Sequence, residues 1–252
     1  MIRPGPEYRR EAFHAGLAAL GYAVKTNRPQ AFAPGDLLVI WNRYGDMHLL
    51  AAQAEKAGVP VIVAENGYFL RPHFGGQHYA LARTGHNGSG AWPAGGGERW
   101  AALGIELAPW RDKGDHILVC PNRAFGRPGY IMPMDWPQRV VERLQRITRR
   151  PVRLRSHPGN VEPKRPLNDA LSNCWAMVIW ASSAGVHGLV AGIPVICEGP
   201  AWIAKGATGA DIKTVDAPVM PERLPVFERL AWAQWTMAEI ASGEPFARLI
   251  AL

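Results

Sequence analysis

The stretch that decides the fold is Ala176–Glu198, which reads AMVIWASSAGVHGLVAGIPVICE. It contains an apolar run, a segment of small and apolar residues that follows two serines, and a second apolar run after a glycine stop at Gly192. This pattern predicts a strand over 176–181, a helix over 183–191 and a strand over 194–198. Two strands joined by a helix of this length are typical of a right-handed βαβ unit in a parallel sheet.

The same alternation of apolar runs and helix-periodic segments extends in both directions from this stretch. Further strands are expected over residues 22–26, 36–41, 60–65, 116–120 and 151–155, and further helices over residues 7–20, 47–57, 137–148, 167–173, 222–233 and 235–252. Residues 72–97 are rich in glycine, histidine and aromatic side chains without periodicity, which predicts a long functional loop. We therefore predict an α/β fold of two Rossmann-like halves whose parallel sheets face a central cleft. A break near Trp110–Gly114 divides these halves into residues 1–112 and 113–252.

Composition indicates an ordinary globular protein. Hydrophobic residues make up 48% of the 252 residues, which is typical of a chain with a packed core. No run approaches the ~18 apolar residues of a membrane helix, and the first residues lack the apolar core of a secretion signal. The three cysteines are far apart and odd in number, which argues against a disulfide framework. We therefore expect a protein of the reducing cytoplasm.

The charge balance suggests an anionic partner. Lysine and arginine number 28 against 21 aspartate and glutamate, so the formal net charge is +7, although only 19% of residues are charged. A sparse surface of one sign favours a nucleotide, a phosphorylated substrate or a nucleic-acid backbone. The alternative is mild basicity without a specific partner.

Common cofactor and metal motifs are absent from the sequence. It contains no P-loop, no Gly-x-Gly-x-x-Gly after a strand and no His-Glu-x-x-His. His73, His78 and His86 share one loop, but no acidic residue or cysteine accompanies them at ligand spacing. We expect neither a metal nor a resident cofactor.

The first chemically suggestive motif is RLRSHPG at residues 153–159. An expected strand ends here, so His157 lies at the carboxyl edge of the sheet, where open α/β sheets bind ligands. Pro158 prevents extension of the strand, and an imidazole donor beside Arg155 suits a phosphate. The alternative is a histidine that only caps a turn.

The second motif is the small-residue turn that follows the strand over 176–181. Ser182 or Ser183 can cap the next helix while the other hydroxyl donates to a phosphate. Small residues such as Gly185 let a ligand approach the backbone closely. The alternative is an ordinary helix cap with tight helix–sheet packing.

Together, the His-Pro and Ser-Ser motifs resemble the carboxyl-terminal domain of B-fold, two-Rossmann glycosyltransferases. The likeness is to bacterial capsule-type transferases and to small phage-type glycosyltransferases, and it is strongest over residues 115–200. In those families the two motifs hold the phosphates of the donor, so the resemblance implies a UDP-, CDP- or CMP-linked sugar as co-substrate. It also implies a bacterial or phage-infected host cell. The expected donor site comprises Arg155, His157, Pro158, Ser182, Ser183, Gly185 and Glu198, with His157 also catalytic.

A candidate base lies in the amino-terminal half. Ala64–Gly67 is similar to the acidic Asp/Glu-Asp/Glu-Gly motif of these transferases, with Asn66 in place of the second acid. A carboxylate at the end of a strand can take a proton from an acceptor hydroxyl, so we predict Glu65 as the catalytic base. Asp46 and His48 are competing candidates, and Asp46 also suits the first turn of a helix. The expected acceptor site comprises Asn66, Tyr68, His86 and Asn87.

Two further features raise the question of a nucleic-acid acceptor. Arg139, Arg143, Arg146 and Arg150 recur along one face of the helix over 137–148, and few acids are close in sequence, which favours phosphate contacts over a solvated salt-bridged face. Aromatic residues of the long loop either stack a flipped base or pack beneath the loop as a satellite core: Tyr68, Phe69, Phe74, Tyr79 and Trp92.

The sequence therefore predicts a metal-independent glycosyltransferase that acts on a hydroxyl acceptor, with a hydroxymethylated base in DNA as the leading acceptor. The alternatives are a capsule- or glycan-directed transferase, a nucleotide-sugar epimerase, and a non-catalytic nucleotide- or nucleic-acid-binding protein on the same fold.

Overall fold

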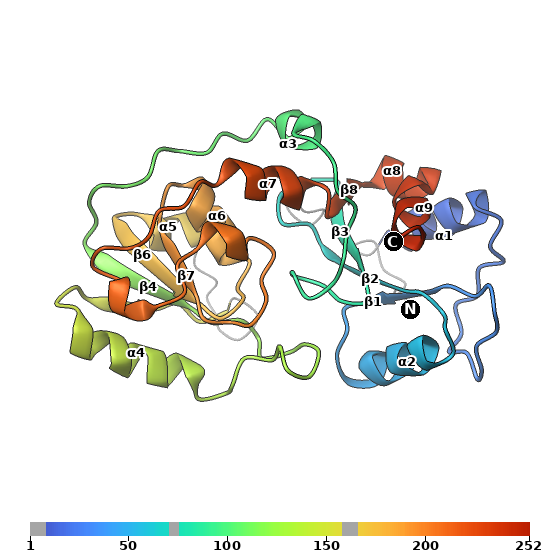
Figure 1. The fold of residues 1–252 in the computed structure, drawn as a ribbon, viewed down its shortest axis with the longest axis horizontal. Coiled ribbons are helices and arrows are strands. Elements are labelled where there is room, and N and C mark those ends of the chain that lie inside the picture. Colours follow the sequence, from blue (N-terminus) through green and yellow to red (C-terminus); the bar gives the residue numbers. More distant parts are fainter. Residues whose placement is uncertain (1–8, 71–75, 158–165) are drawn as a thin grey trace. The chain divides into compact units, whose positions relative to one another are not determined.

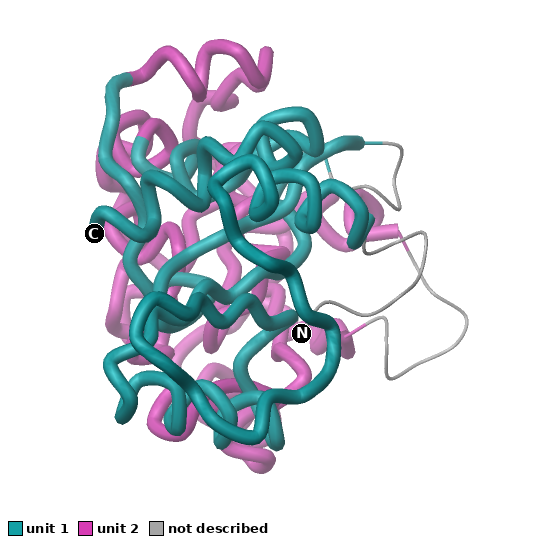
Figure 2. Tube along the Cα trace, turned by 90° about the vertical axis from the view of Figure 1, so that its right-hand side faces the viewer, with its two compact units in different colours: residues 1–96, 229–252 teal, residues 97–228 magenta. Residues whose placement is uncertain are grey.

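The computed structural model describes residues 9–70, 76–157 and 166–252. The chain forms two compact units (Figure 2). Unit 1 comprises Met1–Gly96 and Arg229–Leu252, and unit 2 comprises Gly97–Glu228. None of the described helices is long and apolar enough to cross a membrane.

Unit 1 contains a four-stranded mixed sheet in the order β1-β2-β3-β8 (Figure 1). Its strands are β1 (Leu38–Trp41), β2 (Val61–Asn66), β3 (His78–Arg83) and β8 (Gln234–Thr236). β1 and β2 are parallel and are joined through α2 (Gly45–Lys56), whereas β2–β3 and β3–β8 are antiparallel. The prediction of a purely parallel sheet is therefore wrong for this half.

Different helices pack against the two faces of this sheet, so successive side chains of β2 enter different hydrophobic clusters. Val61 and Val63 pack in the cluster with α2, while Ile62 and Ala64 pack in the cluster with α1, α8 and α9. These three helices are α1 (Arg10–Ala19), α8 (Met237–Ser242) and α9 (Glu244–Ile250). The first four residues of β2 are all buried, and successive side chains enter opposite clusters, as expected for a strand in a sheet that is covered on both faces.

Unit 2 contains a four-stranded, fully parallel sheet in the order β5-β4-β6-β7. Its elements are α3 (Glu98–Ala102), β4 (His116–Cys120), α4 (Trp136–Ile147), β5 (Val152–Leu154), α5 (Leu167–Leu171), β6 (Cys174–Ile179), α6 (Ala184–Val190) and β7 (Val195–Cys197). The helices cover both faces, with α4 on one and α5 and α6 on the other (Figure 1). The strand order reverses between β4 and β6, and ligands of such sheets bind at the carboxyl ends of the strands at that point. The predicted parallel Rossmann-like sheet is confirmed for this half.

The strand–helix–strand unit of the opening motif packs as its pattern requires. Ala176 and Val178 of β6 join Trp136, Val140 and other residues of the α4 cluster. The opposite face of β6 meets α6, because the Cα of Gly185 faces the Ile179 side chain.

Three of the expected elements differ in the structure. No strand forms over residues 22–26, the expected loop over 72–97 contains β3, and the expected helix over 235–252 is split into β8, α8 and α9. Three-residue β8 is too short to show a period, and the glycines around β3 obscured its pattern.

The two units also divide the chain differently from the predicted halves. Residues 97–112 lie with unit 2, and residues 229–252 lie with unit 1. α7 (Leu224–Ala231) carries the chain back to unit 1, where β8 completes the mixed sheet. A hydrophobic pattern reports which face of a segment is buried but not which sheet it joins.

Candidate functional site

Glu65 is held at the carboxyl end of β2, where the strand is half-buried. Its Oε1 atom accepts hydrogen bonds from the Tyr68 hydroxyl at 2.7 Å and from the Asn87 backbone N–H at 3.0 Å. Within the described residues, Oε2 has no hydrogen-bond partner. The structure thus brings together the predicted base and two predicted acceptor residues. One carboxylate oxygen is held by two hydrogen bonds, while the other has no partner in the part of the chain that the structure describes.

Tyr68 reaches Glu65 through a tight turn after β2. A Cβ at Gly67 would lie 2.6 Å from the His78 carbonyl oxygen, so only glycine fits this position without a shift. Gln234 of β8 then accepts hydrogen bonds from the backbone N–H groups of Tyr68 at 3.0 Å and Phe69 at 3.1 Å. Gln234 is fully buried, and sequence reasoning missed it because its two partners are distant in the chain.

Asn87 reaches Glu65 from a loop with unusual backbone geometry. Thr84 and Asn87 have positive φ values of 73° and 49°, and a β-branched residue rarely adopts this conformation. Such strain costs on the order of 1–3 kcal/mol and persists only where surrounding contacts impose it. One such contact is the hydrogen bond that the Arg43 guanidinium donates to the Thr84 carbonyl oxygen at 2.5 Å.

The other residues predicted near the base have separate positions. Asn66 pairs with Tyr79 in the antiparallel β2–β3 ladder. His86 precedes Asn87 and exchanges backbone hydrogen bonds with the Ser89 hydroxyl, while its buried Nδ1 has no hydrogen-bond partner among the described residues. Asp46 lies in the first turn of α2, where a carboxylate interacts favourably with the helix dipole, as its alternative interpretation predicts.

The aromatic residues of this region belong mainly to the core of unit 1. Tyr79 is fully buried, with its ring 5.6 Å from that of Trp41 in an edge-on arrangement. Phe69 is 5% exposed. Trp92 packs against the hydrophobic cluster that contains Tyr79. Phe74 lies outside the described residues. Tyr79 and Trp92 therefore pack into the core of unit 1 and not into a separate satellite core beneath the loop, and Phe69 is buried as well.

In unit 2, His157 follows β5 at the carboxyl edge of the parallel sheet. The Arg155 backbone N–H donates to Val119, which extends the parallel pairing to the end of the strand. The Nδ1 atom of His157 accepts a hydrogen bond from Arg123 Nε at 3.3 Å. A neutral imidazole that accepts at Nδ1 carries its proton on Nε2, the nitrogen that can donate to a phosphate. Pro158 lies outside the described residues.

The serine pair precedes α6 with two different environments. Ser182 is buried, and its hydroxyl accepts a long hydrogen bond from the Ala184 N–H at 3.4 Å. Ser183 is half-buried at the N-cap position and makes no side-chain cap bond. A Cβ at Gly185 would lie 2.8 Å from Ile179 Cδ1 and 2.9 Å from the Trp202 ring. The close approach that Gly185 permits is therefore made by the protein's own side chains.

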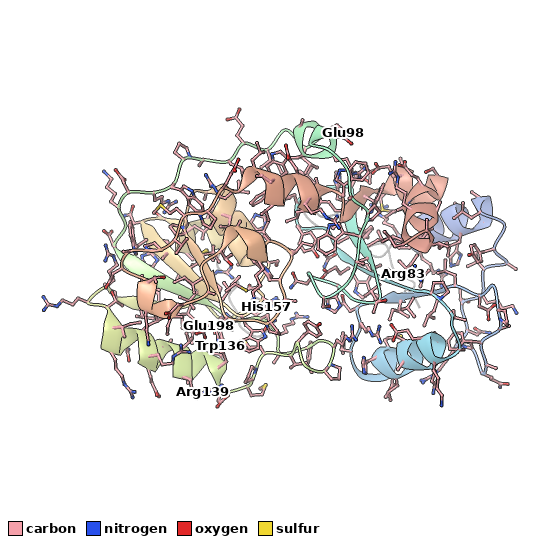
Figure 3. All side chains as sticks on the ribbon, viewed as in Figure 1. Arg83, Glu98, Trp136, Arg139, His157 and Glu198 are labelled. Atoms are coloured by element: carbon pink, nitrogen blue, oxygen red, sulfur yellow. The ribbon has the colours of Figure 1, made fainter. Side chains whose placement is uncertain are left out.

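A cavity of about 400 Å³ opens beside the carboxyl ends of β6 and β7. This volume lies within the range of ~300–1,000 Å³ that is typical of small-ligand sites. Figure 3 labels three of its residues, Trp136 and Arg139 on α4 and Glu198 after β7. The lining consists of Trp136, Arg139, Arg143, Trp180, Cys197, Glu198, Lys205 and Ala210.

Glu198 is the best-connected side chain in this cavity. It accepts hydrogen bonds from Trp136 Nε1 at 2.8 Å and forms an ion pair with Arg143 at 2.9 Å. The Trp136 ring meets the Trp180 ring at a centroid distance of 6.0 Å and a steep angle of 70°. Burial raises the pKa of the Cys197 thiol to about 11, so this cysteine is a protonated wall residue at neutral pH.

Three arginines of the predicted stripe lie on α4, Arg150 follows its end, and the four are more strongly paired than the sequence suggested. Arg139 forms an ion pair with Asp135 at 3.0 Å, Arg143 with Glu198, and Arg150 with Asp216 at 2.8 Å. The premise that acidic partners are lacking is therefore wrong for three of the four arginines. Their partners come from the preceding turn and from loops far along the chain.

No metal-binding cluster of three or more histidine, cysteine or acidic side chains occurs in the part of the chain that the structure describes. His73, one member of the histidine trio, lies outside it. His78 and His86 belong to β3 and to the loop after it.

No family model matches the chain, and no curated protein is significantly similar to it in sequence. The solved structures similar to it include two of KpsC from Thermosulfurimonas dismutans. The first is the beta Kdo 2,4 transferase, with a TM-score of 0.57, 14% identity, and coverage of 88% of this chain and 86% of that one. The second is the beta Kdo 2,7 transferase, with a TM-score of 0.53, 16% identity, and coverage of 91% and 94%. The chain shares the fold of these transferases. At such low identity the likeness extends to the fold and not to the substrates.

Proposed function

We propose that the protein is a glycosyltransferase that moves a sugar from a nucleotide-activated donor to a hydroxyl acceptor. In this proposal unit 2 binds the donor and unit 1 supplies the base. The observation that carries the proposal is the unit 2 cavity, because its chemistry suits an anionic nucleotide better than a neutral metabolite.

The cavity offers both of the interactions that a nucleotide needs. Arg139, Arg143 and Lys205 supply three cationic side chains against the single carboxylate of Glu198. Cationic side chains stabilise phosphate charge, and a carboxylate accepts hydrogen bonds from ribose hydroxyls. Tryptophan rings offer apolar area to a nucleobase. These contacts suit a nucleotide-linked sugar in general, and the resemblance to capsule-type transferases narrows the proposed donor to a CMP-, CDP- or UDP-linked sugar.

In the proposed transfer step every bond and proton is accounted for. The acceptor hydroxyl gives its proton to Glu65 Oε2 while its oxygen forms a bond to the anomeric carbon of the sugar. The bond from that carbon to the donor phosphate breaks, and the nucleotide leaves with the electron pair. His157 Nε2 and the arginines are proposed to stabilise the leaving phosphate, so the protein itself supplies charge compensation that metal ions provide in other sites.

Nucleotide binding tests the donor assignment. Calorimetric titration with CMP, CDP and UDP should show a preferred nucleotide in the parent protein. His157→Ala should weaken its affinity by about tenfold to a hundredfold, because one hydrogen bond to a charged group is worth about 1.5–3 kcal/mol. Arg139→Gln should weaken it as well. The matched control for Arg139→Gln is Arg146→Gln, because Arg146 is a cation of the same helix that does not line the cavity. His157 does not line the cavity either, so His157→Ala tests the separate phosphate contact that we propose at the end of β5. Unchanged affinity in folded His157→Ala and Arg139→Gln proteins would refute the donor site.

Turnover distinguishes an enzyme from a binding protein. Incubation with a panel of nucleotide sugars should release free nucleotide, and Glu65→Gln should remove that release while leaving nucleotide affinity unchanged. Product analysis without an acceptor separates transfer from epimerisation. Tight binding of a nucleotide without any conversion of its sugar would favour the non-catalytic alternative.

The proposed acceptor is a hydroxyl compound of one of two classes, a base in DNA or a saccharide. A hydroxymethylated base in DNA would provide a hydroxyl for Glu65, and binding to DNA would weaken steeply with salt. The acidic partners of Arg139, Arg143 and Arg150 reduce the support for this acceptor. A salt titration of duplex binding decides the question, since a flat dependence would point to a free saccharide or a capsule-type glycan.

A further inference from the structure

We propose that Arg43 is a positioning residue for the Glu65 carboxylate, acting through the loop over residues 84–87. The catalytic meaning of this inference rests on the proposed function, whereas the placement itself can be tested without any substrate. Arg43 does not contact Glu65. It is argued to set the position of the Asn87 N–H, which does.

Arg43 is the most deeply buried charged side chain of unit 1. It lies two residues after β1 and is 1% exposed. Its guanidinium binds both carboxylate oxygens of Glu55 on α2, at 2.5 and 2.7 Å, and its Nε donates to His48 Nδ1 at 3.4 Å. The remaining contact is the hydrogen bond from NH1 to the Thr84 carbonyl. A buried ion pair is weak evidence for stability, since an apolar side chain can fill the same space at lower cost. The ion pair with Glu55 therefore does not by itself explain why an arginine is buried here, and we consider its hydrogen bond to the Thr84 carbonyl instead.

The loop that Arg43 holds is strained and close to the carboxylate. Thr84 and Asn87 are in the left-handed region, and the Thr84 N–H donates to Val61 of β2 at 2.8 Å. Thr84 is thus bound on both sides, through its N–H to the sheet and through its carbonyl to Arg43. Only two residues separate it from Asn87, whose N–H donates to Glu65 Oε1 at 3.0 Å. A shift of the Thr84 carbonyl is therefore transmitted over a very short length of chain.

The consequence concerns the orientation of Glu65. With the Asn87 and Tyr68 donors both on Oε1, the carboxylate has a defined direction and Oε2 is the oxygen left for chemistry. Loss of the Asn87 bond leaves Tyr68 as the one remaining hydrogen bond to Oε1 from the described residues. A less restrained carboxylate lowers the rate of proton transfer more than it lowers the affinity for a donor bound on unit 2.

Amide hydrogen exchange of the ¹⁵N-labelled full chain tests the placement. Arg43→Met keeps an unbranched side chain but removes every donor, and Arg43→Lys keeps the charge but loses the two-pronged geometry. Both should speed exchange at the Asn87 N–H by about tenfold or more, which corresponds to ~1.4 kcal/mol of lost protection. Arg43→Lys serves as the second variant if Arg43→Met does not fold.

The matched control is Arg229→Met. Arg229 is a half-buried guanidinium of unit 1 that donates to the backbone carbonyls of Trp92 and Pro93. It has no contact with residues 84–87 among the described residues. The inference is supported if exchange at Asn87 rises in the Arg43 variants and stays at the parent rate in Arg229→Met. It is overturned if a folded Arg43 variant exchanges Asn87 at the parent rate, or if the control speeds exchange equally.

Steady-state kinetics separates this inference from the proposed function. With a nucleotide sugar that the parent turns over, Arg43→Lys should lower kcat by about tenfold and leave the donor KM within about twofold. A raised KM with unchanged kcat would overturn the positioning role. Absence of turnover in the parent would contradict the proposed function, while the exchange result would still decide whether Arg43 places Asn87.

Discussion

Replacing Gln234 by leucine removes the single acceptor that two buried backbone amides share. The Gln234 Oε1 atom accepts from the N–H groups of Tyr68 and Phe69, whose residues are 3% and 5% exposed. Leucine has a similar volume and no acceptor, so the substitution isolates the hydrogen bonds from the packing.

The expected loss of stability follows from the two orphaned donors. A buried donor that loses its partner costs about 1–3 kcal/mol, so two of them cost roughly 2–6 kcal/mol. This is a large part of the 5–15 kcal/mol that is typical of a folded domain. Because the same turn carries the Tyr68 hydroxyl, the change should also loosen the hydrogen bond to Glu65.

Urea unfolding followed by tryptophan fluorescence measures this loss, with far-UV circular dichroism as a second probe. The matched control is Gln77→Leu, a glutamine side chain that is exposed just before β3, for which we expect a change within about 0.5 kcal/mol. A Gln234→Leu protein that unfolds within about 0.5 kcal/mol of the parent would refute the assigned role of Gln234.

Three further predictions concern burial and packing. Burial lowers the pKa of His116 below its ordinary value of 6.5, so as the pH falls the unfolded chain binds a proton before the folded chain does. The free energy of unfolding should therefore decrease below about pH 6.5. Urea titrations at several pH values should show a smaller decrease for His116→Gln than for the parent. Burial raises the pKa of the thiols of Cys120 and Cys174 to about 12. At about pH 8 a thiol reagent should therefore label these two cysteines only after the protein unfolds. Rapid labelling of the native protein would contradict this prediction. Gly67→Ala should destabilise the protein by about 1–3 kcal/mol, measured by its urea midpoint, because the new methyl group meets the carbonyls of His78 and Phe69.

Much of unit 2 could be predicted from local pattern. The strand over His116–Cys120 has the predicted bounds, and α6 and β7 fall within one residue of theirs. Strand and helix periods are local properties, because each reports which side of a segment is buried. For the same reason the carboxyl ends of the strands were found, and with them the positions of Glu65 and His157.

What the sequence alone determined is therefore the βαβ unit of Ala176–Glu198, the α/β class, and the strand ends on which candidate side chains sit. Only the tertiary structure decided which segments meet. Gln234 binds the amide of Tyr68 across 166 residues, Arg43 binds Thr84 across 41, and Arg143 binds Glu198 across 55. No period along the chain encodes such pairings, because they depend on how distant segments pack and on which buried donors and acceptors then need partners. The mixed sheet of unit 1 and the support of its carboxylate are for this reason properties of the folded chain.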